Sequence, residues 1–378
     1  MRLRLLPASF MPLNSLHILN FRNIESAELV LHPRVNLFYG ENGAGKTSIL
    51  EAISLLGRGR SFRSHKLKPL IQQGCAGVTV FGRLVGEDGS TRKLGVERNT
   101  RSADSFRLDG QSVASAAELA KILPLQVIYS ETFELLVGGP LERRQFLDWL
   151  VFHVKHEFLP AWRQARQALK QRNTLLRSGR INADLLAPWD IELARNAETL
   201  HLLREEVFNL FNQELALLLQ DLPALTSVNI SYFGGWEEGV SLAEILRQNF
   251  ARDGQLGHTS AGPHRADLKL RLGKMPAAEV LSRGQQKLFV CALRICAGRV
   301  FKQLTGNDCV YLIDDLPSEL DEEHRLRLAK WLIELDSQVF ITGVARKDLE
   351  SVWNQLAVPR KVFHVEQGSV TATPINND

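Results

Sequence analysis

One segment, FYGENGAGKTSILEAI at residues 38–53, constrains the fold of this chain more than any other. It matches the phosphate-binding pattern G-x-x-x-x-G-K-[ST] at every defined position, and these positions are Gly40, Gly45, Lys46 and Thr47. An apolar run, RVNLFYG, precedes the loop and predicts a buried strand. A helical run, TSILEAISLLG, follows it and is expected to end at Gly57. Strand, loop and helix in this order predict a P-loop nucleotide-binding domain.

The residue types in this loop suit phosphate binding. Glycines let the chain turn tightly so that successive N–H groups point at one phosphate, and the start of the next helix adds a positive potential. Lys46 would act as a catalytic charge at the β- and γ-phosphates, and Thr47 would hold Mg²⁺. A glycine-rich turn that binds nothing is the alternative, and the complete motif in its proper setting disfavours it. The expected nucleotide-binding residues are Gly40, Glu41, Asn42, Gly43, Ala44, Gly45, Lys46, Thr47 and Ser48.

The composition is that of an ordinary soluble protein. Apolar residues make up 44% of the chain, and the net charge of +4 is mild, so an anionic partner has to be inferred from local clusters. The cysteines show no zinc-type spacing and are interpreted as reduced core residues of a cytoplasmic protein. They are Cys75, Cys291, Cys296 and Cys309.

The start of the chain predicts neither export nor membrane insertion. Pro7 interrupts a very short apolar run, so a signal peptide is not expected. No apolar stretch reaches the roughly twenty residues that span a bilayer. Met11 is an alternative start, which would make the first ten residues a dispensable extension.

The pattern along the chain predicts a nucleotide-binding head that is split by a helical insertion. Residues 1–140 are expected to form short strands around the phosphate-loop helix. Residues 141–225 are expected to form long helices with breaks at Pro160, Pro188 and Pro223. Residues 226–378 return to strands and a long helix, and the insertion has no sustained heptads, which excludes long coiled-coil arms. The predicted fold class is α/β, with a mixed sheet, flanking helices and an inserted helical domain.

A second phosphate-site motif, DCVYLIDDLPSELD, lies late in the chain. Its apolar residues 310–313 predict a buried strand that ends at Asp314 and Asp315, in the form of a Walker B motif. Asp314 would hold Mg²⁺ opposite Thr47. Asp315 would be the catalytic carboxylate that polarises the attacking water, and because aspartate is shorter than glutamate we expect slow hydrolysis. Acidic strand ends are common, so this motif gains its weight from the phosphate loop in the same chain.

The segment LSRGQQK, residues 281–287, resembles the LSGGQ signature of ABC-type ATPases, with Arg283 in place of one glycine. Ser282 can cap the helix that follows, and Gly284 allows close approach of an anion to the backbone. An ordinary capped helix is the alternative. In the ABC family these residues bind the γ-phosphate held by the other subunit, so the resemblance implies an ATP-dependent homodimer. SELD, residues 318–321, matches the D-loop of that family.

Several further segments resemble the RecF family, in the SMC/Rad50 branch of the ABC-type ATPases. They are LHILNFRNIE, GRGRSFR, GGPLERRQFLDW, GPHRADL and LIDDLPSELD. The resemblance implies an ATPase of recombinational DNA repair and replication, weak and stimulated by DNA. It also implies partners: RecO and RecR, with which such a protein helps to load RecA at single-strand gaps in DNA.

The resemblance leaves two positions of the site open. ABC ATPases commonly carry a switch histidine after the Walker B strand, and the segment VFITGVARKD has none, although Thr342 lies within it. Gln126 in LPLQVIY is the candidate Q-loop residue at the nucleotide. An ATPase subunit of a transporter and another SMC-like chromosome ATPase remain as alternatives. The helical insertion, the missing histidine and the basic runs argue against the transporter.

Two basic runs are candidates for contact with DNA phosphates. The first lies in residues 52–86, which contain no acidic residue. Instead of DNA, the arginines of this run could contact the nucleotide or a partner subunit. The second run, AWRQARQALKQRNTLLRSGR, predicts a helix with one basic face, for which a solvated surface is the alternative. The candidate DNA-binding residues are Arg58, Arg60, Arg63, Arg163, Arg166 and Lys170.

Overall fold

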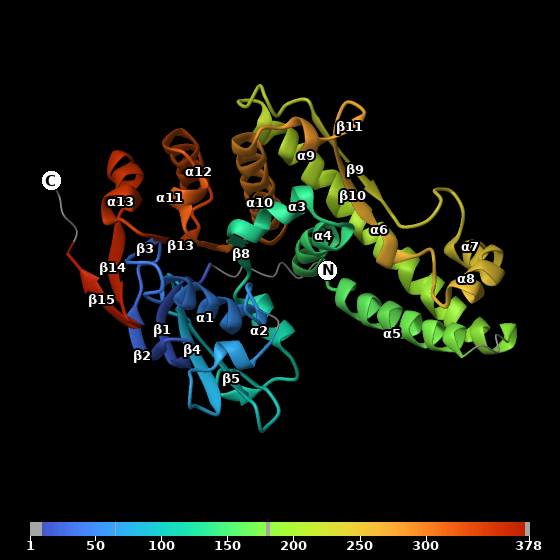
Figure 1. Cartoon of the computed structure of the whole chain (residues 1–378), viewed down its shortest axis with the longest axis horizontal. Helices are drawn as coiled ribbons and strands as arrows, with labels where there is room; N and C mark the ends of the chain where they lie inside the picture. Colours follow the sequence, from blue (N-terminus) through green and yellow to red (C-terminus); the bar gives the residue numbers. More distant parts are fainter. Residues whose placement is uncertain (1–9, 65, 179–181, 375–378) are drawn as a thin grey trace. The chain divides into compact units, whose positions relative to one another are not determined.

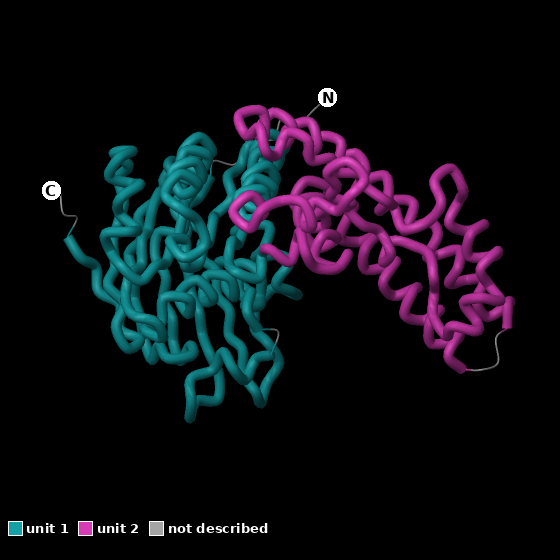
Figure 2. Tube along the Cα trace, turned by 45° about the horizontal axis from the view of Figure 1, so that its top comes forward, with its two compact units in different colours: residues 1–132, 287–378 teal, residues 133–286 magenta. Residues whose placement is uncertain are grey.

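The computed structural model describes residues 10–64, 66–178 and 182–374, so the predicted dispensable start of the chain lies almost entirely outside the described residues. The chain divides into two compact units (Figure 2). Unit 1 comprises residues 1–132 and 287–378, and unit 2 comprises residues 133–286. The insertion in the head therefore extends to residue 286, whereas the sequence pattern placed its end at residue 225.

The described residues of unit 1 form two six-stranded sheets. The first is antiparallel, in the order β2-β1-β4-β5-β6-β7, and the second is mixed, in the order β15-β14-β3-β13-β12-β8. The strands are β1 (Leu13–Phe21), β2 (Ile24–Val30), β3 (Val35–Tyr39), β4 (Gly77–Val85), β5 (Thr91–Asn99), β6 (Ser105–Leu108), β7 (Gln111–Ser112), β8 (Leu125–Ile128), β12 (Val310–Ile313), β13 (Gln338–Gly343), β14 (Arg360–Glu366) and β15 (Ser369–Thr373). The helices are α1 (Lys46–Arg58), α2 (Ala116–Ile122), α10 (Arg283–Thr305), which begins in unit 2, α11 (Leu316–Glu319), α12 (Glu322–Glu334) and α13 (Arg346–Gln355).

Helix α1 lies between the two sheets and is buried along almost its whole length. It contacts β1, β4 and β5 on one side and β8 and β13 on the other, while α10, α12 and α13 lie across the second sheet from it (Figure 1). The helix passes through Gly57 and ends at Arg58, with Gly59 in the left-handed conformation at φ 67° as its cap. The predicted end at Gly57 was therefore wrong. A side chain at Gly57 would collide with Leu125, which explains a glycine inside the helix.

The parallel strands of the second sheet bring distant segments to one edge. β3 pairs with β13, β13 with β12, and β12 with β8, all parallel and with almost entirely buried residues. The loops that follow the carboxyl ends of these strands meet at the same edge, where α/β sheets commonly bind ligands. They contain the phosphate loop after β3, Asp314 and Asp315 after β12, and Tyr129 and Ser130 after β8.

Unit 2 combines long helices with a small antiparallel sheet in the order β11-β10-β9. Helices α5 and α6 pack along each other, and one face of the sheet packs on α4 and α6. The elements are α3 (Glu134–Val137), α4 (Pro140–Val154), α5 (Phe158–Arg177), α6 (Ala183–Leu219), β9 (Val228–Phe233), α7 (Leu242–Gln248), α8 (Phe250–Leu256), β10 (Asp267–Leu272), β11 (Met275–Pro276) and α9 (Ala277–Val280). Pro160 lies in the first turn of α5, just after the interruption between α4 and α5, and Pro223 follows the end of α6, so helices are interrupted beside both prolines as predicted. Pro188 lies inside α6, which continues through it, so the break predicted there was wrong.

Ion pairs inside unit 2 join segments that lie far apart in the sequence. The Arg143 guanidinium donates to both carboxylate oxygens of Asp267, at 2.7 and 3.1 Å. Arg204, almost fully buried in α6, donates to both oxygens of Asp148 and to the Pro263 carbonyl. The GGPLERRQFLDW and GPHRADL segments are thus held together by charged hydrogen bonds. This explains why residues after 225 fold with the helices and not with the head.

The structure tests two further predictions. Cys291, Cys296 and Cys309 are buried and form no disulfide within the described residues, as expected, but Cys75 is exposed and so is not a core residue. Among the helices of the described residues, none combines the length and the apolarity needed to cross a membrane.

Candidate functional site

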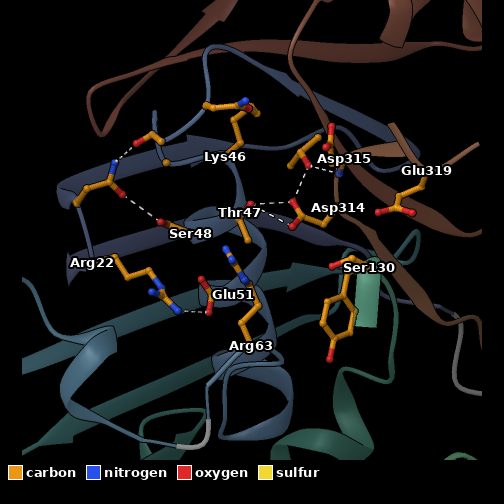
Figure 3. Close-up of a pocket in the computed structure, with 16 residues that line it drawn as sticks. Arg22, Lys46, Thr47, Ser48, Glu51, Arg63, Ser130, Asp314, Asp315 and Glu319 are labelled. Carbon is orange, nitrogen blue, oxygen red and sulfur yellow. Dashed lines mark hydrogen bonds and ion pairs between the residues drawn. The ribbon is translucent and has the colours of Figure 1, made fainter. Parts of the chain in front are cut away.

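A polar cavity of about 450 Å³ opens in unit 1 at the edge where the parallel strands end (Figure 3). The phosphate loop, the start of α1 and the Walker B acids line it together. They contribute Asn42, Gly43, Gly45, Lys46, Thr47, Ser48, Asp314 and Asp315. Two motifs that lie at opposite ends of the sequence are therefore brought to one site, as their residue patterns predicted.

The phosphate loop is shaped by close backbone packing. Gly40 has a φ of 154°, and a Cβ at this position would overlap the carbonyl oxygen of Val365 in β14. Lys46 folds back over the loop, and its Nζ donates to the carbonyls of Gly40 and Glu41 at 2.6 and 2.8 Å. Burial lowers the pKa of Lys46, while the carboxylates of Asp315 and Asp314 oppose this shift. The loop therefore holds its cation close to the place where phosphates would bind.

Asn23 fastens the loop from outside the motif. Its side-chain amide donates to the carbonyls of Gly43 and Ala44, at 3.2 and 3.0 Å, and its oxygen accepts from the Ser48 hydroxyl at 3.0 Å. Asn23 lies in the turn between β1 and β2, within the LHILNFRNIE segment. Asn23 lies outside the phosphate-loop motif, so the motif alone does not predict it as a residue of the site.

Asp314 is the centre of the hydrogen bonds in the cavity. It accepts from the Thr47 hydroxyl at 2.9 and 3.1 Å and from the Thr342 hydroxyl at 2.7 Å. Burial raises the pKa of Asp314, and the two threonine hydrogen bonds and the charge of Arg63 act in the opposite direction. Thr342 also accepts from the backbone N–H of Asp315 at 2.8 Å. In the chain segment without a switch histidine, Thr342 thus fixes both Walker B acids.

The pairing of Thr47 with Asp314 fits a magnesium site. A hydroxyl and a carboxylate are oxygen donors of the kind that Mg²⁺ prefers, and Mg²⁺ commonly takes only one or two protein ligands and completes its shell with phosphates and water. Within residues 10–64, 66–178 and 182–374, no group of three His, Cys, Asp or Glu side chains could hold a metal ion by itself. Phosphate oxygens and water would complete the shell of a Mg²⁺ held by Thr47 and Asp314.

Asp315 stands in an unusual backbone conformation beside Asp314. Its φ is 53°, in the left-handed region, and it precedes the short helix α11. One of its carboxylate oxygens is buried and has no hydrogen-bond partner in the described part of the chain. An unpartnered buried oxygen at the wall of a polar cavity is free to accept from a water molecule or a ligand.

The signature residues form a capping box at the start of α10. The Ser282 hydroxyl accepts from the Gln285 N–H at 3.3 Å, and the Gln285 side chain accepts from the Ser282 N–H at 2.9 Å. This confirms Ser282 as the helix cap. Ser282 and Gly284 are exposed, belong to unit 2, and are not among the residues that line the cavity. Further along α10, Lys287 pairs at 2.9 Å with Glu319 of the D-loop, which does line the cavity.

The Q-loop candidate has a different environment. Gln126 is buried in β8 and accepts from an Arg294 N–H at 3.3 Å, and it is not among the residues that line the cavity. Tyr129 and Ser130, which directly follow β8, line it instead. Strand residues face the core, whereas residues past the strand end reach the cavity, and the sequence did not fix where this strand stops.

The basic runs divide into different surroundings. Arg63 lines the cavity, Arg60 is exposed, and Arg58 is partly buried, with its pKa lowered to about 10 by burial and by the charges of Arg60 and Arg294. The arginines of the first run therefore do not form one surface. In the second run the three predicted residues are all exposed on α5, opposite its buried alanines. They are Arg163, Arg166 and Lys170.

Fold and cavity together define an ABC-type ATPase head of the SMC kind. The family model "RecF/RecN/SMC N terminal domain" matches residues 12–371. A head domain of Smc from Pyrococcus furiosus has the same fold, with a TM-score of 0.56 at 14% identity over 96% of both chains. The chain belongs to the RecF family. It is 49% identical to the DNA replication and repair protein RecF of Cellvibrio japonicus over 96% of this chain and 99% of that protein.

Other relatives agree with this assignment. The RecF protein of Azotobacter vinelandii is 48% identical, over 96% of this chain and 99% of that protein. A solved structure described as the recombination mediator protein RecF-ATP in the RecFOR pathway superimposes with a TM-score of 0.85 at 25% identity, covering 97% of this chain and 99% of that one. The family shown is not that of a transporter subunit.

Proposed function

We propose that this chain is an ATP-dependent DNA-binding protein of recombinational repair, in which ATP closes a homodimer on DNA and slow hydrolysis opens it again. The observation that carries the proposal is the cavity in which the phosphate loop meets the Walker B acids, with Thr47 hydrogen-bonded to Asp314. The relative of known structure contains ATP, which supports ATP as the nucleotide of this site. The name of the relatives supports the biological role.

Within the cavity each residue has a separate task. The loop backbone and Lys46 bind the phosphates, and Thr47 and Asp314 would hold Mg²⁺, which would neutralise phosphate charge. Asp315 accepts a hydrogen bond from the attacking water through its unpartnered oxygen. An aspartate reaches less far than a glutamate, so turnover is slow. Arg63, which was predicted as a DNA contact, is assigned to the nucleotide, because it lines the cavity and its charge acts on Asp314.

The second half of the site is supplied by another copy of the chain. Ser282 and Gly284 are exposed at the start of α10, where the positive end of the helix dipole favours an anion. In the family the signature binds the γ-phosphate of the opposite subunit, and a two-fold arrangement makes two such sites at once. On DNA the dimer acts with RecO and RecR to help load RecA at single-strand gaps. The relative described within the RecFOR pathway supports these partners.

The test is ATP turnover with and without DNA. The purified chain should hydrolyse ATP slowly, and duplex or gapped DNA should raise the rate severalfold. The increase should disappear in high salt, because phosphate contacts weaken as salt rises. An ATPase rate that DNA does not change would contradict the proposed coupling, and a chain that binds no ATP would contradict the whole proposal.

A further inference from the structure

Helix α1 carries a fully buried carboxylate, Glu51, one turn beyond Thr47. One of its oxygens accepts from the Arg22 guanidinium at 2.6 Å and from the Ser61 hydroxyl at 2.5 Å. Its other oxygen has no partner in the described residues, although Glu51 lines the nucleotide cavity. A buried charge is costly unless it is paired, so its presence here needs a reason.

Glu51 joins two segments that both supply an arginine to the cavity. Arg22 lies in the turn between β1 and β2, with a φ of 55°. Ser61 follows α1, and its hydroxyl oxygen also accepts from the N–H groups of Arg63 and Ser64, at 3.0 and 3.1 Å. Through this one hydroxyl, Glu51 fixes the turn from which the Arg63 side chain extends toward Thr47 (Figure 3).

We propose that Glu51 is a positioning residue of the nucleoside-triphosphate site, holding Arg22 and the Ser61–Ser64 turn so that two guanidiniums face the phosphate region together. This inference rests on the proposed function, in which ATP is hydrolysed in this cavity. A guanidinium binds phosphate through a planar fork, so its orientation matters as much as its charge. Holding it in place before ATP arrives removes the entropy that a free arginine side chain loses on binding.

The charge of Glu51 has a second consequence. Arg22, Lys46 and Arg63 place three positive charges around the cavity, and their mutual repulsion is opposed by the carboxylates that also line it, which are Asp314, Asp315 and Glu319 besides Glu51. A buried carboxylate at 2.6 Å from Arg22 offsets part of this repulsion. Its removal would therefore weaken the arrangement of the arginines more than the phosphate loop, whose backbone and Lys46 bind phosphate independently of it.

The test is Glu51→Gln, which keeps the shape and one acceptor oxygen and removes the charge. We expect kcat for ATP hydrolysis to fall about tenfold, because a small displacement of a positioned group costs about that much or more in rate. KM for ATP should change less than about threefold. Ser54→Ala is the matched control. Ser54 is also buried on α1, but its hydroxyl donates to the Arg60 carbonyl and not to a residue of the cavity, so this variant should keep the parent kcat.

A double-mutant cycle with Arg22→Ala separates positioning from simple structural support. If Glu51 acts through Arg22, the double variant should lose little more kcat than the worse single variant, because coupled residues are not additive. Fully additive losses, or a Glu51→Gln protein with parent kcat and only a lower Tm, would overturn the inference. If Glu51→Gln does not fold, Arg22→Lys keeps the charge without the planar fork. An unchanged kcat in that variant would equally overturn the inference. Absence of ATP hydrolysis in the parent protein would instead contradict the proposed function.

Discussion

The hydroxyl of Thr342 shows how a single residue controls the metal-binding acid. It donates to Asp314, whose pKa is raised by burial, and this hydrogen bond favours the ionised carboxylate. It also accepts from the Asp315 N–H and so links the two acids. The sequence does not predict this role, because a threonine within an apolar strand carries no recognisable signal by itself.

We predict that Thr342→Val moves the acid limb of the ATPase pH profile to higher pH. Removing the hydrogen bond raises the pKa of Asp314 further, and only the ionised carboxylate holds the metal, so activity is lost at a higher pH as the solution is acidified. Thr342→Ser keeps the hydroxyl and should retain the parent profile. Steady-state rates from mildly acidic to mildly alkaline pH at saturating ATP measure this. A valine variant with the parent profile would show that the hydroxyl does not act on Asp314.

Mutations of the two Walker B acids should have different effects on ATP binding and turnover. Asp315→Asn keeps Thr47 and Asp314, so ATP and Mg²⁺ should still bind while turnover falls by about a hundredfold or more, as general-base catalysis is removed. Asp314→Asn should weaken Mg²⁺-dependent ATP binding itself, because it removes a charged metal ligand. Titration calorimetry with a slowly hydrolysed ATP analogue, with and without Mg²⁺, distinguishes the two. Identical behaviour of both variants would contradict the separate roles of metal ligand and general base.

Lys46→Ala provides the simplest test of the nucleotide site. The ammonium is the main point charge at the expected β- and γ-phosphates, so we expect ATP affinity to fall about a hundredfold or more. Lys46 is nearly buried and donates to two loop carbonyls, so the melting temperature should be recorded as well. Normal ATP affinity in a folded Lys46→Ala protein would remove the basis of the proposed function.

At the scale of elements, the sequence predicted those that a motif or a strong apolar period defines. The strands β3 and β12 and the helices α1 and α10 occur where the phosphate loop, the Walker B acids and the signature placed them. The predictions of helix ends and breaks failed where tertiary packing outweighed the local preference of a residue. Gly57 was expected to end α1, but it sits inside the helix against Leu125. Pro188 lies in the second turn of a 37-residue helix that continues through it.

The basic face of α5 supports a prediction about DNA. Neutralising Arg163, Arg166 and Lys170 to Gln removes three positive charges from exposed positions of one helix. If these side chains bind phosphates, the log–log salt dependence of DNA binding should become shallower by about 0.9 for each phosphate that is no longer neutralised. Affinity at low salt should fall by about tenfold or more, since each of these charges releases counterions when DNA binds.

A control with the same change in net charge is available on the same helix. Gln164, Gln167 and Gln171 are exposed and follow each basic residue by one position, so their change to Glu also lowers the charge by three. This variant should weaken binding mildly and keep the parent slope. Fluorescence anisotropy of labelled DNA at several salt concentrations measures the affinity and the slope for both variants. Equal slopes of the salt dependence in the two variants would indicate that the basic face of α5 is an ordinary solvated surface.

At the scale of the whole molecule, the division into units depends on contacts that no local pattern reveals. Residues after 225 have strand character like the head, and the sequence therefore assigned them to it. Their place is set by charged hydrogen bonds from α4 and α6, such as Arg143 to Asp267 and Arg204 to the Pro263 carbonyl. The partners are separated by between 59 and 124 residues, so composition and periodicity could not predict them.

The last prediction concerns the assembly of two molecules. A shared site requires the exposed signature of one subunit to approach the γ-phosphate held by the other, so ATP should favour the dimer and ADP, which lacks that phosphate, should not. Ser282→Arg would place a long cationic side chain in the interface between the two subunits. It would also remove a helix cap worth about 1 kcal/mol, without touching the phosphate loop. We therefore expect this variant to bind ATP nearly as the parent does, yet to stay monomeric, with little ATPase activity.

Ser282→Asn retains the cap and isolates the effect of bulk and charge, so it should dimerise at least partly. Analytical ultracentrifugation with ATP, ADP and DNA measures the outcome. A normal ATP-dependent dimer from Ser282→Arg, or a parent that remains monomeric with ATP and DNA, would contradict the shared site.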